Sequence, residues 1–184
     1  MKKLLLVTVI TILGLVHVNA QNVKLGIKGG LNFATITGDN TSKDQIVTAF
    51  NFGTMAEIKI SEKFSFQPEL LYSGQGYDTG INTEGIIALN YLNIPLIAKY
   101  YVTKRLSLEA GPQIGFLLST KGGTEDYKNL FKTTDFGVNL GIGYKLDNGL
   151  NFGARYVLGL SNINDVGGVT NKNGVLQLNV GYFF

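Results

Sequence analysis

The side chains in this chain that could do chemistry are carboxylates and cations, not imidazoles or thiols. The 184 residues include no cysteine, no tryptophan and a single histidine. Charged residues stand in segments where polar residues or glycine alternate with apolar residues: Lys28, Glu57, Glu69, Lys99, Glu109, Asp135 and Arg155. Two neighbouring carboxylates, such as Glu69 and Glu109, could work as an acid–base pair. The sequence forms no substrate cleft around them, so we expect no catalytic residues.

The first twenty residues, Met1–Ala20, are typical of a secretory signal peptide. Lys2 and Lys3 precede the apolar run Leu4–Val16, which is too short for a transmembrane helix. Cleavage would remove the only histidine and lower the number of basic residues from 16 to 14, against 13 acidic ones. The remaining chain is nearly neutral, and we therefore expect no nucleic-acid partner. Without His or Cys it also lacks the usual nucleophile–base pairs and zinc ligands.

Two groups of loop residues could bind a hard cation. One comprises Asp39, Asn40 and Asp44, and the other Glu125 and Asp126. Oxygen ligands of this kind suit calcium, but neither spacing matches an EF-hand loop. Ordinary polarity of solvated loops explains both groups, so we predict no metal and no cofactor.

The elements that must position the charged residues are β-strands. Side chains alternate between the two faces of a strand, so alternating apolar and polar residues predict one apolar and one polar face. The pattern occurs in eight segments, each about as long as the 9–11 residues that cross a bilayer at a tilt. The segments are Val23–Phe33, Val47–Ile60, Phe64–Gly76, Leu89–Val102, Leu106–Leu118, Thr134–Leu146, Leu150–Leu160 and Gly174–Phe184.

Short and long connections alternate between these strands. The short ones are 61–63, 103–105 and 147–149, and the last contains an Asn-Gly pair suited to a tight hairpin. The long ones are Thr37–Ile46, Tyr77–Ala88, Ser119–Thr133 and Ser161–Asn173. Within them, Glu125–Phe131 could form a helical turn that docks on the rim or on a partner. The sequence therefore predicts an all-β fold over residues 21–184: a single eight-stranded, antiparallel, up-and-down transmembrane β-barrel with both termini at the short turns.

Alternation alone does not say whether the apolar face points outward to lipid or inward to a lipocalin-like cavity. Three observations favour lipid. At least eleven glycines stand on the polar face, where a crowded interior needs small residues, and aromatic residues lie toward the strand ends, as in interfacial girdles. The chain also stops on Tyr182 and Phe184, which resemble the C-terminal barrel-assembly signal of bacterial outer-membrane barrels.

If the polar face points inward, the seven charged residues share one narrow lumen. Buried charges are costly unless they are paired. We therefore predict a network of salt bridges and hydrogen bonds, with Arg155 as a fork between carboxylates. The same network could serve a gated conduction path or a proton relay, or it could be a plug that holds the barrel together. We favour the plug, because eight strands leave an interior just wide enough for side chains.

Several segments resemble the PorT-like outer-membrane β-barrel family of Bacteroidota. They are 25–32 (LGIKGGLN), 91–96 (YLNIPL), 111–115 (GPQIG) and 154–163 (ARYVLGLSNI). The resemblance implies an eight-stranded outer-membrane barrel exported through a cleaved leader. PorT itself is associated with type IX secretion, so a secretion role for this chain rests on resemblance alone. The family supplies no functional residues to carry over.

We therefore expect an integral protein of the Gram-negative outer membrane that is not an enzyme and binds through its long loops. Its expected partners are outer-membrane lipid, the barrel-assembly machinery during insertion, and proteins at the long loops. Two alternatives stay open at this point: a narrow porin-like channel and an outer-membrane lipid-modifying enzyme.

Overall fold

The computed structural model describes residues 23–39, 41, 45–79, 85–122, 127–165 and 168–184. The predicted signal peptide, Met1–Ala20, lies outside the described residues. The strands are β1 (Val23–Gly38), β2 (Val47–Lys59), β3 (Phe64–Asp78), β4 (Ile86–Tyr101), β5 (Leu106–Gly122), β6 (Thr134–Lys145), β7 (Leu150–Gly159) and β8 (Asn171–Phe183). A 3-10 helix, η2 (Lys128–Leu130), lies between β5 and β6. Among the described residues, no helix has the length and hydropathy needed to span a membrane.

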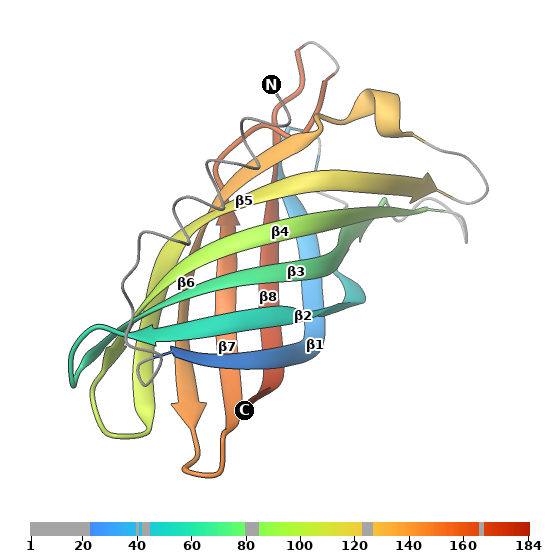
Figure 1. Ribbon diagram of the computed structural model, residues 1–184. Coiled ribbons are helices and arrows are strands. Elements are labelled where there is room, and N and C mark those ends of the chain that lie inside the picture. The colour runs from blue at the N-terminus through green and yellow to red at the C-terminus, as the bar shows by residue number, and fades with distance from the viewer. Residues whose placement is uncertain (1–22, 40, 42–44, 80–84, 123–126, 166–167) are drawn as a thin grey trace, which may run out of the picture.

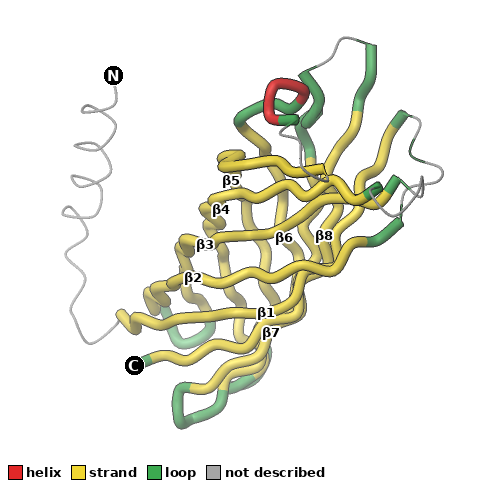
Figure 2. The backbone as a smooth tube through the Cα atoms, turned by 90° about the vertical axis from the view of Figure 1, so that its right-hand side faces the viewer, coloured by secondary structure: helices red, strands yellow, loops and turns green. Residues whose placement is uncertain are grey.

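The strands form a closed antiparallel barrel in chain order, with β8 paired to β1 (Figure 1). Four-residue turns join β2 to β3, β4 to β5 and β6 to β7, at what we call the short-turn rim. Figure 2 shows η2 and the described ends of the longer connections at the opposite end, the long-loop rim. The predicted fold class is confirmed, and Gly149 has the positive φ (93°) expected of the Asn-Gly hairpin.

The two faces of the barrel wall point as predicted. Large apolar side chains line the outside, and Phe50 and Phe184 leave 71% and 75% of their surfaces exposed. Most inward positions in the middle of the barrel are polar, charged or glycine, and Asn32 and Asn139 are completely buried, although Leu71 and Ile97 also point inward. A continuous apolar surface of this extent is incompatible with water, and the closed ladder satisfies the backbone groups that would face hydrocarbon.

Several strands extend further toward the long-loop rim than the alternation predicts. β1 runs to Gly38, and β4 begins at Ile86, so part of each expected loop is strand. At this end of the strands the pattern is inverted: Ile36 and Leu89 point inward and are buried, whereas Thr35 and Thr37 lie on the outer face. The barrel wall there has the polar exterior of a water-soluble protein. Figure 1 shows the ends of β4 and β5 projecting from the barrel wall.

Candidate functional site

The centre of the lumen is occupied by an ion cluster built around Arg155 of β7. Its guanidinium donates two hydrogen bonds to the carboxylate of Glu69 on β3, both at 3.0 Å, and one to Glu109 on β5 at 2.8 Å. Each of the three residues is at most 7% exposed. The planar guanidinium fits two acceptors at once, a geometry that lysine does not offer. Arg155 thereby connects three strands across the lumen.

Two lysines complete this cluster. Lys28 of β1 contacts Glu69 at 3.1 Å, and Lys99 of β4 contacts Glu109 at 3.1 Å. Gln67 links the two halves, because its amide donates to Glu69 at 2.6 Å and its oxygen accepts from Lys99 at 3.1 Å. The cluster holds three cations and two carboxylates, so each carboxylate is fully compensated, as burial requires.

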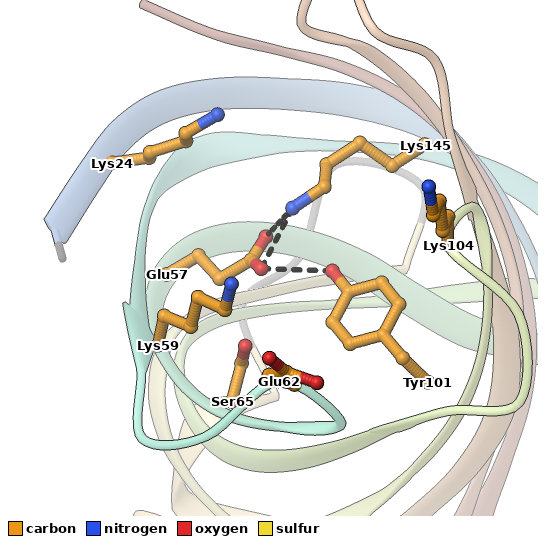
Figure 3. A pocket seen from close by; sticks show the side chains of 8 residues that line it. All are labelled: Lys24, Glu57, Lys59, Glu62, Ser65, Tyr101, Lys104 and Lys145. Carbon is orange, nitrogen blue, oxygen red and sulfur yellow. Dashed lines mark hydrogen bonds and ion pairs between the residues drawn. The ribbon is translucent and has the colours of Figure 1, made fainter.

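The remaining two of the seven predicted residues lie apart from the central cluster. Near the short-turn rim, Glu57 accepts two hydrogen bonds from Lys145, at 2.7 and 2.8 Å, and one from the Tyr101 hydroxyl at 2.8 Å (Figure 3). The expectation of a single network shared by all seven residues was therefore too simple. Lys145 was not among the predicted residues, although its position on the inward face of the expected strand Thr134–Leu146 could have indicated it.

Asp135 lies nearer the long-loop rim and has neutral partners. The Ser161 hydroxyl donates to it at 2.7 Å, and the Asn173 amide donates at 2.8 Å. Asn173 also donates to the Tyr91 hydroxyl at 3.4 Å. Among the described residues, no cation forms an ion pair with Asp135. The charged residues thus lie in three groups along the lumen.

Little space remains around the central cluster. The cavity beside it, lined among others by Lys28, Lys99 and Arg155, has a volume of about 20 Å³. A volume of this size holds about one water molecule and no organic substrate. The two carboxylates of Glu69 and Glu109 share the same guanidinium, so neither is free to transfer a proton to a substrate.

The long-loop rim is closed by a group of buried apolar side chains that sequence reasoning missed. We call it the outer apolar cluster: Ile36, Leu89, Tyr91, Leu117, Phe131 and Ile163. Tyr127 packs against it from the expected helical turn, and Phe131 follows η2 into it. Of the two outcomes expected for this turn, docking on the rim or on a partner, the structure shows docking on the rim. Leu130 of the same turn remains 45% exposed.

The connections after β5 and β7 hold this cluster in place. The Lys132 amide donates to the Ile163 carbonyl at 2.7 Å, and the Asp165 amide donates to the Leu130 carbonyl at 2.9 Å. The sequence does contain a signal for this cluster. Beyond Phe33 and before Leu92, the apolar residues move from the outward to the inward positions of the strand. In the sequence alone, this change looks like the start of a loop.

A closed barrel with an apolar wall and a charged lumen is the architecture of an outer-membrane protein. Residues 19–165 match the model of the outer membrane protein beta-barrel domain family. The chain belongs to this family. As a member of the outer membrane protein beta-barrel domain family it is an integral barrel of the Gram-negative outer membrane, and the predicted location is confirmed.

Solved outer-membrane barrels have the same fold. Neisserial surface protein A, NspA, is 15% identical with a TM-score of 0.60, and the match covers 87% of this chain and 97% of NspA. Ail, the attachment invasion locus protein of Yersinia pestis, is 15% identical with a TM-score of 0.55, covering 88% of this chain and 98% of Ail. At this identity the likeness concerns the fold. No curated protein matches the sequence.

In barrels of this location the short turns face the periplasm and the long loops face outside. The predicted C-terminal pair lies on the lipid-facing wall at the periplasmic end, where the rings of Tyr182 and Phe184 meet edge to face at 5.9 Å. Phe183, between them, points inward and is 3% exposed. The role of the pair in barrel assembly stays a prediction.

The loop groups considered for a cation fall mostly outside the described residues. Asn40, Asp44, Glu125 and Asp126 are among the residues that the structure does not describe. The carboxylate of Asp39 accepts a hydrogen bond from the Thr170 amide at 2.9 Å. Within the described part of the chain, no group of three or more possible ligands could hold a metal ion.

Proposed function

We propose that this protein is a non-conducting, non-enzymatic barrel that binds a protein partner at its long-loop rim. The observation that carries the proposal is the filling of the lumen at two levels. Arg155 bridges Glu69 and Glu109 at the centre, and the outer apolar cluster closes the outer end. A lumen filled in this way supports neither a continuous water path nor a substrate pocket.

The strand extensions support a role at the long-loop rim. β4 and β5 have 16 and 17 residues, whereas about 9–11 suffice to cross a bilayer. The additional residues raise a rigid sheet above the lipid, and rigid strands hold binding residues more precisely than free loops do. Thr37 and Lys172 form one exposed cross-strand pair on this part of the wall.

We expect no steady unit currents when the folded protein is inserted into a planar lipid bilayer. Side chains of the central cluster and of the outer apolar cluster obstruct the path of ions. The measurement is single-channel recording at low and high salt. Steady currents that disappear on Arg155→Ala would contradict the proposal and support the porin-like channel.

A photo-crosslinking residue at the long-loop rim should capture the partner in living cells. We expect adducts of defined mass at Thr37, Lys121 and Lys172, which are exposed on the extended strands. The same residue at Lys63 or Thr103, exposed at the short-turn rim, is the matched control and should give no such adduct. Adducts equally frequent at both rims, or at neither, would refute the assignment of binding to the long-loop rim.

The alternative of a lipid-modifying enzyme is testable in the same cells. Lipid A from cells with and without the protein should have identical mass spectra.

The narrower resemblance to PorT-like proteins of Bacteroidota, with its link to type IX secretion, is a separate hypothesis. Loss of secreted cargo on deletion of the gene would support it.

A further inference from the structure

The short-turn rim contains a cavity that the filled lumen does not use. It has a volume of about 340 Å³ and opens at the periplasmic end of the barrel. Eight residues line it: Lys24, Glu57, Lys59, Glu62, Ser65, Tyr101, Lys104 and Lys145. This volume corresponds to roughly eleven water molecules at about 30 Å³ each, enough for a small ion or metabolite. Figure 3 shows its lining side chains.

The floor of this cavity is already compensated. Glu57 is 4% exposed, and its carboxylate is bound by the Lys145 ammonium and the Tyr101 hydroxyl. The Lys145 ammonium also lies over the rings of Tyr101 and Phe183, at 5.1 and 5.4 Å from their centroids. These contacts fix the floor as a rigid neutral surface, so it gives a ligand no net charge to neutralise.

The wall of the cavity carries uncompensated positive charge. Lys24 and Lys59 lie on one side and Lys104 on the other (Figure 3). None of the three forms an ion pair with a described residue. The exposed carboxylate of Glu62 is the remaining charge of the lining, so the eight lining residues have a net charge of two positive.

Ser65 supplies a neutral donor inside the same cavity. The residue is 1% exposed, and its hydroxyl makes no hydrogen bond to any described residue. The Ser65 hydroxyl is not among the fully buried unpaired polar atoms of the described residues, so its oxygen is open to the cavity. Its position in the lining lets it donate to a bound anion.

We propose that this cavity binds a compact dianion of the phosphate class, either inorganic phosphate or a small phosphate monoester from the periplasm. The net charge matches a dianion, and lysine ammonium groups bind phosphate oxygens as point charges. The lining contains no arginine, so an anion would be held by lysine point charges and not by a planar fork. An anion in the cavity would lie between Lys24 and Lys59 on one side and Lys104 on the other, with the Ser65 hydroxyl as a further donor. The site is independent of the partner proposed for the long-loop rim.

The test is titration of the folded full chain, in zwitterionic micelles, with inorganic phosphate and with glycerol 3-phosphate. Amide NMR shifts should saturate and be confined to the cavity lining. The triple variant Lys24→Gln, Lys59→Gln, Lys104→Gln should bind phosphate about tenfold more weakly, since each exposed charge contributes modestly. Ser65→Ala should weaken binding severalfold, an effect that diffuse surface charge would not produce.

The matched control removes three lysines from the opposite end: Lys121→Gln, Lys132→Gln and Lys172→Gln, all exposed. It should bind phosphate as the parent does. The proposal is overturned if the control loses as much affinity as the cavity variant, if Ser65→Ala has no effect, or if no saturable shift occurs. Succinate of equal affinity would overturn the assignment to phosphate. Band shifts on unheated gels verify that each variant is folded.

Discussion

Replacing Arg155 with alanine should destabilise the folded barrel by about 3–5 kcal/mol, the usual cost of removing one partner from a buried ion pair. The loss is large because the buried carboxylates of Glu69 and Glu109 lose three charge-assisted hydrogen bonds at once, and each keeps only one lysine. The chain lacks tryptophan, so folding is best followed by the gel mobility of unheated samples against guanidinium concentration.

Arg105→Ala is the matched control for this prediction. Arg105 pairs with Asp147 between two short turns, where both side chains are well exposed, and exposed ion pairs contribute little to stability. A second control is Arg155→Lys, which keeps the positive charge without the planar fork and should lose less stability than Arg155→Ala. Equal destabilisation by Arg105→Ala and Arg155→Ala would contradict the account of the central cluster.

The barrel and its inward residues were predictable because a lipid-facing wall imposes a strict rule on the sequence. Every outward position between the rims must be apolar, so a charge such as Arg155 in an alternating strand can only point inward. Contact with Glu69 and Glu109 then followed from the narrowness of an eight-stranded interior. All three residues stand within the first six residues of their strands, counted from the short-turn rim, so their heights in the lumen are similar.

The height of each residue along the lumen was harder to predict from the sequence than the face on which it lies. It depends on the register, and Glu69 stands opposite Met55, which places Glu57 nearer the short-turn rim than Glu69. Glu57 therefore meets Lys145, which is 88 residues away in the chain, instead of the central cluster. Counting residues from the turns ignores the stagger between strands that closes a barrel.

At the long-loop rim, the strands were predicted too short for a different reason. Beyond the hydrocarbon the rule for the wall no longer applies, and inward residues become apolar, as Ile36 and Leu117 do. The alternation continues with its faces exchanged, so a search for an apolar outer face ends the strand too early. The strand residues of the outer apolar cluster lie in these exchanged segments. Their packing against Phe131 and Ile163 depends on the conformation of the connecting loops, which the alternation does not indicate.

Gly53→Ala should lower the free energy of unfolding by about 1–3 kcal/mol, although it adds only one methyl group. Gly53 lies on the inward face of β2 opposite Leu71. A Cβ atom there would overlap the carbonyl oxygen of Leu70 and lie 2.8 Å from the Cα atom of Leu71. Both obstacles are backbone atoms of β3, so the two strands must separate, and the ladder between them must weaken.

At Gly53 the need for glycine thus comes from the backbone of the next strand, whereas a Cβ atom at Gly143 would meet the Glu109 side chain, as expected for crowding. Gly153→Ala on β7 provides the control, because its Cβ would meet nothing closer than the Ile142 carbonyl oxygen at 3.8 Å. Guanidinium titration of both variants in lipid vesicles should give a lower midpoint for Gly53→Ala alone. A matching decrease for Gly153→Ala would indicate that alanine lowers stability at any inward glycine, independent of contact with the neighbouring strand.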